Sequence, residues 1–234
     1  AGTYYPKPDA YHTVDLYNKD VVKLPAEFPA IVKLETVGKT HGGDPLYLTR
    51  VTDPAATGKR LKIMITFGEH AREFLPVESF FRLVRDIGAK HASKDPSTLH
   101  ILQHAELLLV GLVNPSGRRH LEKTQDMCWR GMANGVDVNR NFAWEYGGPG
   151  SSANKNNEEF RGAHVFSEPE SMAMRDLAKR EKIDAFLSMH TGAQYIFVPY
   201  GDTISKRTKR RHPTTRKQLT LANVMWAASG GYYT

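Results

Sequence analysis

A histidine and a glutamate three residues apart form the first pair in this sequence that could bind a metal ion. His70 and Glu73 belong to the segment Gly68-Glu-His-Ala-Arg-Glu73, which joins an apolar run at 61–67 to residues with helical spacing. Zinc accepts an imidazole nitrogen and a carboxylate oxygen, and a catalytic zinc takes three protein ligands while a fourth position stays open. Such pairs are common on helix surfaces, where acidic residues simply favour the positive end of the helix dipole. A third ligand is needed to indicate a metal site.

His190 is the candidate for the third ligand. It follows an apolar run at 184–189, as His70 follows the run at 61–67. The carboxyl ends of strands in an α/β sheet gather at one edge, so histidines at two such ends can reach the same ion. The chain holds ten histidines, and a single one could stand at a strand end by chance. Two of them together with Glu73 favour a metal site.

A long segment at 118–165, rich in glycine, asparagine and charge, separates these ligands and predicts a functional loop region. It contains Gly135-Val-Asp-Val-Asn-Arg-Asn-Phe142, whose residue types suit recognition of an anion. Arg140 can bind a carboxylate through two parallel hydrogen bonds, and Asn139 can add a third. A turn stabilised by an asparagine or aspartate side chain is the alternative interpretation of this motif.

Two further residues of the same segment could act beside a metal ion. Arg130 could face an oxyanion that develops on a zinc-bound carbonyl. Asp137 could accept a hydrogen bond from a histidine ligand, as carboxylates beside zinc-binding histidines commonly do.

Strands alternating with helices predict that these residues are positioned by one α/β domain over residues 1–234. Apolar or alternating patterns predict strands at 31–37, 46–52, 61–67, 107–113, 184–190 and 195–200, the first two forming a hairpin. Apolar spacing and capping residues predict helices at 14–28 with an interruption at Pro25, at 76–90, from Asp95 to Leu102, from an N-cap at Ser167 to about Glu181, and at 219–228.

The composition, with 40% hydrophobic and 24% charged residues, is that of an ordinary globular protein. No apolar run reaches the ~18 residues of a membrane-spanning helix. The single cysteine, Cys128, excludes an internal disulfide framework and a metal site made of several cysteines.

The net charge of +7 raises the question of nucleic acid as a partner. Much of the excess lies in the run Lys206-Arg-Thr-Lys-Arg-Arg211, which we expect to be a solvated loop. Binding of a polyanion and sensitivity to proteases are the alternatives. No groove-binding helix or aromatic RNA-binding motif accompanies the run, so we expect no nucleic-acid partner.

Taken together, the motifs resemble the zinc metallocarboxypeptidases of the carboxypeptidase A/B type. The similar segments occur in the order of that family and cover roughly residues 10–201: HARE at 70–73, NPSG at 114–117, WR at 129–130, GVDVNRNF at 135–142, EEFRG at 158–162, SEPE at 167–170 and FLSMHTGAQYIFVPYG at 186–201. The resemblance implies a single α/β domain with a mixed, twisted central β-sheet and helices on both faces.

The resemblance also implies a role for each candidate residue. It makes His70, Glu73 and His190 the ligands of one Zn²⁺ per chain, and Asp137 the carboxylate behind the first histidine. It makes Arg130 the catalytic arginine that stabilises the transition state. The substrate-binding residues would be Asn139 and Arg140, which clamp the terminal carboxylate, and Arg72, which contacts the penultimate part of the substrate.

The function implied is that of a zinc-dependent hydrolase, an exopeptidase that removes the C-terminal amino acid from peptides and proteins. Its partners would be peptide or protein C-termini and a propeptide or protein inhibitor, and we expect a monomer that is secreted, vesicular or lysosomal. The alternatives are a zinc amidase or deacylase on the same fold, and a catalytically defective protein that binds zinc and a peptide C-terminus. The arginine and asparagine set around Arg140 argues against the amidase.

The family's general-base glutamate and its mobile tyrosine have no match in the chain, of which 234 − 190 = 44 residues follow His190. Trp226 could replace the tyrosine, but we prefer an alignment in which 219–228 is an ordinary helix, and neither alignment supplies the glutamate. None of Glu145, Glu158 and Glu159 matches the base. Because a sheet that ends early exposes an edge, we expect a domain lacking its C-terminal strands and helix, with a complete but inactive chain as the alternative.

Overall fold

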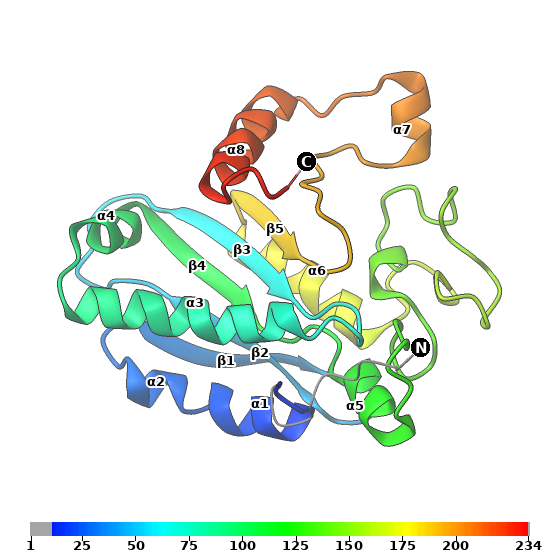
Figure 1. The fold of residues 1–234 in the computed structure, drawn as a ribbon, viewed down its shortest axis with the longest axis horizontal. Coiled ribbons are helices and arrows are strands. Elements are labelled where there is room, and N and C mark those ends of the chain that lie inside the picture. The colour runs from blue at the N-terminus through cyan, green and yellow to red at the C-terminus, as the bar shows by residue number, and fades with distance from the viewer. Residues whose placement is uncertain (1–10, 234) are drawn as a thin grey trace.

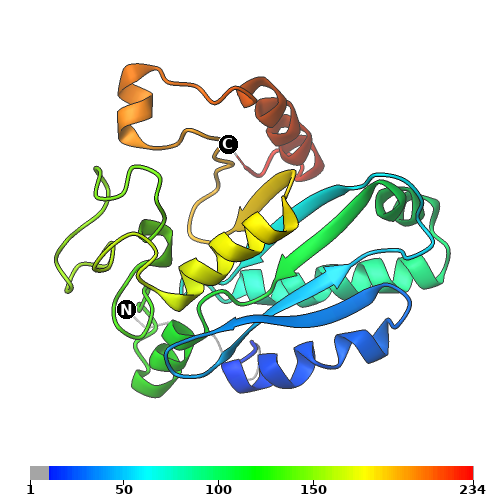
Figure 2. The same ribbon diagram turned by 180° about the vertical axis from the view of Figure 1, so that it is seen from behind.

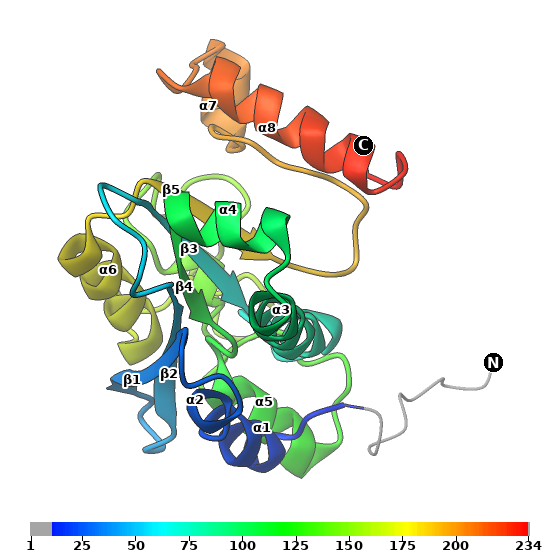
Figure 3. The same ribbon diagram turned by 90° about the vertical axis from the view of Figure 1, so that its left-hand side faces the viewer.

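A five-stranded mixed sheet runs through the computed structural model, which describes residues 11–233, and helices lie on both of its faces (Figures 1 and 3). The strand order is β1-β2-β4-β3-β5. β1 (Val32–Lys39) and β2 (Pro45–Val51) form the predicted antiparallel hairpin, and β2 also pairs antiparallel with β4 (Ala105–Val110). β3 (Leu61–Phe67) runs parallel to both β4 and β5 (Ala185–Met189). The fold class implied by the resemblance is thus confirmed.

The alternation of side chains along the central strands supplies two hydrophobic cores. All six residues of β4 are buried, and Leu107 and Leu109 face one cluster while Leu108 and Val110 face the other. The first core is covered by α1 (Val14–Val21), α2 (Leu24–Glu27), α3 (Leu75–Ala92) and α4 (Pro96–His104). α6 (Pro169–Glu181) covers the opposite face, as Figure 2 shows. This two-sided burial explains the continuous apolar runs of β3 and β4.

Several predicted boundaries differ from the structure. The predicted helix at 14–28 is two helices, because the chain turns at residues 22–23 and Pro25 lies in the first turn of α2, where proline is tolerated. The helix predicted from Ser167 has Glu168 as its N-cap, without a side-chain capping bond.

The prediction of one loop region over 118–165 is wrong at its start, where α5 (Pro115–Thr124) forms. Asn114 caps this helix by accepting a hydrogen bond from the amide of Gly117, and Pro115 occupies the first turn. These are regular helix-start signals, and the predicted helices did not include one here. Later in the segment, a short 3₁₀ turn at Val138–Arg140 begins at the N-cap Asp137.

The segment after β5 departs most from the prediction. Residues 195–200 form no strand, and the side chains of Tyr195 and Phe197 are 58% and 71% exposed. Part of the basic run, predicted to be a solvated loop, belongs to α7 (Thr203–Thr208), and α8 (Thr215–Ala228) begins earlier than predicted. These two helices lie at the top of Figure 1, and α8 buries none of its residues. None of the helices described between residues 11 and 233 has the length and apolar character to cross a membrane.

Candidate metal centre

The candidate ligands stand at the carboxyl edge of the two parallel strands β3 and β5. β3 ends at Phe67, and Gly68 turns the chain with a positive φ of 66°. A Cβ atom at Gly68 would come within 2.9 Å of the Leu112 side chain, so both conformation and space require glycine here. The turn brings the next residues back over the sheet edge before α3 begins.

Arg118, on α5, binds the backbone of this turn. It is almost fully buried, and its guanidinium donates to the carbonyl oxygens of Ala71 (2.7 Å) and Glu73 (2.9 Å) while stacking over the Phe74 ring at 4.0 Å. Burial lowers the pKa of Arg118 to about 10, so the side chain still carries its charge at neutral pH. The sequence analysis missed this residue, since a basic residue in a polar segment carries no signal of burial.

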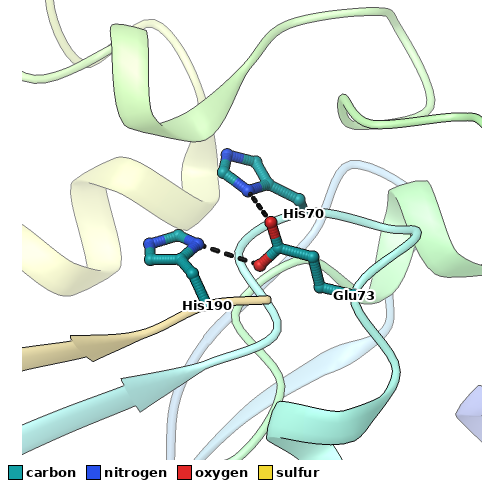
Figure 4. A group of neighbouring side chains, drawn as sticks. All are labelled: His70, Glu73 and His190. Atoms are coloured by element: carbon teal, nitrogen blue, oxygen red, sulfur yellow. Dashed lines mark hydrogen bonds and ion pairs between the residues drawn. The ribbon is translucent and has the colours of Figure 1, made fainter. Parts of the chain in front are cut away.

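The three candidate ligands converge on one point (Figure 4). His70 Nδ1 lies 2.7 Å from Glu73 Oε1, and His190 Nδ1 lies 2.9 Å from Glu73 Oε2. One ligand atom from each residue lies within 4.8 Å of those of the other two. Within the described part of the chain, no other group of three histidine, cysteine or acidic residues has such an arrangement.

The donor set and its surroundings fit zinc. Two imidazole nitrogens and one carboxylate are a known catalytic zinc set. Both rings turn Nδ1 toward Glu73, while their Nε2 atoms are held from the other side: that of His70 by Asp137 Oδ1 at 3.3 Å, and that of His190 by Ser188 Oγ at 2.8 Å. In this structure, each Nδ1 is hydrogen-bonded to Glu73. A ring that donates through Nε2 would offer the Nδ1 lone pair to a metal ion that replaces this bond.

The electrostatics of the site keep its carboxylates ionised. Burial raises the pKa of Glu73, but hydrogen bonds from His190 and His70 outweigh it and lower the pKa to about 2. Burial likewise raises the pKa of Asp137, but the hydrogen bond from His70 and the charge of Arg130 lower it to about 2. For His70, burial lowers the pKa, yet hydrogen bonds to Asp137 and Glu73 raise it above its ordinary value.

Arg130 lies beside the ligands, as its predicted role requires. Its Nε donates to Asp137 Oδ2 at 2.9 Å, and its Nη1 lies 3.3 Å from His70 Nδ1. The side chain is only 16% exposed, and the Arg130 carbonyl accepts a hydrogen bond from the amide of Ala71. The guanidinium is therefore fixed next to the place where a bound group would meet the ion.

The predicted substrate-binding residues are brought together only in part. Asn139 reaches the centre, with Nδ2 3.2 Å from His190 Nε2. Arg140 instead donates to Gly150 O at 2.5 Å and pairs with Glu159 at 3.1 Å. Arg72 donates to Cys128 O at 2.8 Å and pairs with Glu158 at 2.9 Å.

Two residues of the centre's surroundings were missed by the sequence analysis. Glu69, which we had assigned only to the helix dipole, is 4% exposed, and its carboxylate accepts from Thr66 Oγ1 and Ser188 Oγ. Ser188 stands two residues before His190, which places both side chains on one face of β5, and this spacing was a signal in the sequence.

Known proteins resemble this chain over most of its length. The family model of the zinc carboxypeptidases matches residues 17–232. Carboxypeptidase A2 of Mus musculus is 27% identical in an alignment of 247 positions that covers 95% of this chain and 58% of the relative. Carboxypeptidase A1 of Rattus norvegicus is 31% identical in an alignment of 202 positions that covers 82% of this chain and 47% of the relative.

Solved structures share the fold. A thrombin-activatable fibrinolysis inhibitor structure has a TM-score of 0.79 and 23% identity, covering 91% of this chain and 54% of its own. The carboxypeptidase A from Helicoverpa armigera has the same score and identity, covering 93% of this chain and 53% of its own.

The chain belongs to the zinc carboxypeptidase family, whose cofactor is Zn²⁺. It spans about half the length of the curated relatives that it matches.

Proposed function

We propose that His70, Glu73 and His190 hold one zinc ion and that the chain carries the metal and substrate-carboxylate sites of an exopeptidase. The observation that supports this most directly is that one ring nitrogen of each histidine and one carboxylate oxygen of Glu73 lie within 4.8 Å of one another. When bound, zinc supplies Lewis-acid chemistry that polarises a peptide carbonyl and lowers the pKa of water. The ionised Glu73 and the two Nε2 partners keep the donor atoms oriented for it.

Arg130 would supply positive charge where negative charge develops on the peptide carbonyl. Its pairing with the buried Asp137 fixes the guanidinium before substrate arrives, and such preorganised donors contribute strongly to rate. The same aspartate accepts from His70, so one carboxylate orients both a ligand and the cation beside it.

Asn139 and Arg140 would bind the free C-terminal carboxylate of the substrate. Arg140 pairs with Glu159 in this structure and is 30% exposed, so a substrate carboxylate would take the place of the glutamate. A substrate with a blocked C-terminus would leave the arginine without this partner, and such losses discriminate strongly between substrates.

Peptide and protein C-termini are accordingly the proposed substrates, for a monomer in a secreted, vesicular or lysosomal setting. A bovine thrombin-activatable fibrinolysis inhibitor, 25% identical to this chain, was solved in complex with a tick carboxypeptidase inhibitor. We extend the proposal to control of the site by a protein inhibitor or a propeptide.

Hydrolysis of a peptide and of its C-terminally amidated twin by the full-length protein tests the proposal, together with elemental analysis of the metal. We expect one zinc per chain and cleavage of the free peptide only. Equal rates on both peptides would refute exopeptidase action, and a chain without stoichiometric zinc would refute the metal centre.

A second candidate is a protein that binds zinc and a peptide C-terminus without cleaving it. Asp202 is the one acidic residue in 191–233, and its carboxylate caps α7 through Ser205 N (2.7 Å) and accepts from Trp144 Nε1 (3.1 Å). The hydrogen-bonding partners of the Asp202 carboxylate are thus Ser205 and Trp144, and none of the three candidate ligands is among them. Peptide binding with no product after long incubation would favour this candidate over the enzyme.

A further inference from the structure

We infer that Glu69 positions His190 for metal binding by orienting the hydroxyl group of Ser188. This inference rests on the proposed metal centre and adds to it a positioning residue that touches no ligand directly. The contacts that carry it run from the Glu69 carboxylate to Ser188 and from Ser188 to the His190 ring.

The Glu69 carboxylate joins the two parallel strands behind the centre. Thr66 of β3 and Ser188 of β5 are paired across the sheet, and each hydroxyl donates to Glu69 Oε1 at 2.5 Å. Only 4% of Glu69 is exposed. The strand register thus fixes both hydroxyl groups on the same carboxylate oxygen.

The hydrogen bond to Glu69 determines whether Ser188 donates to His190 or accepts from it. A serine hydroxyl has one proton, and here it points to the carboxylate. Toward His190 Nε2, 2.8 Å away, Ser188 Oγ can then only accept. The ring therefore donates from Nε2 to Ser188. With zinc in place of the hydrogen bond between Nδ1 and Glu73 Oε2, this is the tautomer that a metal ligand needs.

Asn139 does not select this tautomer. Its Nδ2 lies 3.2 Å from His190 Nε2, but a half-turn of the amide would present its oxygen instead, so this residue suits either protonation of the ring. Ser188 has no such freedom while Glu69 accepts its proton.

The arrangement parallels that of the other histidine. Asp137 accepts directly from His70 Nε2, whereas Glu69 acts on His190 through one intervening hydroxyl. Each imidazole ligand thus has a buried carboxylate behind it.

A purely structural residue would not need to be acidic at this position. Glu69 adjoins a cavity of about 570 Å³ whose walls include Met64, Val113 and Phe142, and its second oxygen, Oε2, has no hydrogen-bond partner among residues 11–233. Burying an unsatisfied carboxylate oxygen costs stability, which an apolar side chain of similar size would avoid. A side chain with an acceptor oxygen at this position is therefore explained better by its action on Ser188.

The test measures, in the full-length protein, zinc affinity by chelator competition and the solvent exchange of the His190 Nε2 proton by ¹H–¹⁵N NMR of the zinc-loaded form. Glu69→Leu and Ser188→Ala should each weaken zinc binding about 10–100-fold. Both should also speed the exchange of that proton, because its acceptor is removed or no longer oriented. Glu69→Gln retains an acceptor oxygen and Ser188→Thr retains the hydroxyl, so both should stay within about threefold of the native affinity.

The double variant Glu69→Leu/Ser188→Ala should bind zinc no more weakly than the weaker single variant, because both act on one path. Thr66→Val is the matched control, since it removes a hydroxyl from the same carboxylate without contacting His190, and it should leave zinc affinity and the exchange of the His190 Nε2 proton unchanged. Thermal unfolding without metal checks the fold, and Glu69→Leu should be as stable as the native chain or more so.

Native zinc affinity and native exchange of the His190 Nε2 proton in both Glu69→Leu and Ser188→Ala would overturn this inference and leave the metal centre standing. Additive losses in the double variant, or an equal effect of Thr66→Val, would also overturn it. A native protein that binds no zinc would refute the proposed centre itself and this inference with it.

Discussion

At the scale of single residues, Arg130 is the side chain whose replacement should distinguish metal binding from catalysis. It touches the buried Asp137 and approaches His70, but it is not one of the three converging ligands. Replacing it should therefore leave the ion in place and remove the positive charge that meets the developing oxyanion.

We expect Arg130→Met to lower kcat/KM about 10²–10³-fold, the loss typical of a preorganised donor to an oxyanion. Methionine keeps most of the apolar stem, and zinc content measured in parallel should remain at one per chain. Asp137→Asn is the comparison variant, because it removes the anion that His70 contacts and should weaken zinc binding instead. A kcat/KM in Arg130→Met within a few-fold of native would contradict the proposed role.

A second residue-scale prediction concerns the pair between Arg140 and Glu159. The two side chains are 30% and 41% exposed, so the pair itself contributes ~0–1 kcal/mol. Because the substrate carboxylate would displace Glu159, Glu159→Gln should lower KM by up to about fivefold with kcat unchanged. Glu35→Gln, which frees Arg180 from an exposed pair with no proposed role in substrate binding, is the matched control. An unchanged or raised KM in Glu159→Gln would show that Glu159 does not compete with substrate.

At the scale of elements, the segment before α1 is tied to α3 by a titratable pair. His12 Nδ1 lies 2.8 Å from Glu78 Oε2, and its ring stacks on Phe81 at 4.3 Å between centroids. The hydrogen bond to Glu78 raises the pKa of His12 above its ordinary value of 6.5 despite burial. Burial raises the pKa of Glu78, but hydrogen bonds from His12 lower it below 4.5. The pair is thus charged on both sides at mildly acidic pH.

The stability that this pair contributes should depend on pH in a defined direction. The contribution of His12 is complete below pH 6.5 and is lost as pH rises through the folded pKa, while that of Glu78 is complete above pH 4.5 and is lost in stronger acid. Glu78→Gln should therefore destabilise the protein most between these values and less above about pH 8. Urea unfolding across this range measures the difference, and a loss independent of pH would contradict the assignment.

The elements also show how much the sequence could predict. The limits of β3 and of the hairpin followed from apolar runs and the residues that end them, because these signals are local. The same signals predicted that His70 and His190 lie at one edge of the sheet. The helix α5 was missed since its capping signals at Asn114 also suit a turn. The strand predicted at 195–200 fails for another reason: strands need a partner, and no described strand lies beside it. The contacts of Glu69 and Glu159 depend on register and loop conformation, which no local pattern encodes.

At the scale of the whole molecule, the candidate centre joins parts of the chain that are distant in sequence. His190, at the end of β5, contacts Glu73 across a separation of 117 residues. β5 lies at the edge of the described sheet, with Phe186 57% exposed, and α8 beyond it buries no residue. β5 is joined to β3 by the pairing of 63–67 with 185–189, and a metal ion shared by Glu73 and His190 would add a link at the end of these strands.

Zinc should accordingly stabilise the folded chain measurably. A ligand that binds only the folded state at 100 times its Kd contributes ~2.7 kcal/mol, so a strong chelator should lower the unfolding midpoint by several degrees, and added zinc should restore it. His190→Ala removes one ligand together with the link to β5, and its midpoint should respond far less to either treatment. Mg²⁺, which prefers oxygen ligands in octahedral geometry, should not replace zinc in the native protein. If chelation leaves the native midpoint unchanged while peptide hydrolysis stops, the ion serves catalysis without joining the two parts of the fold.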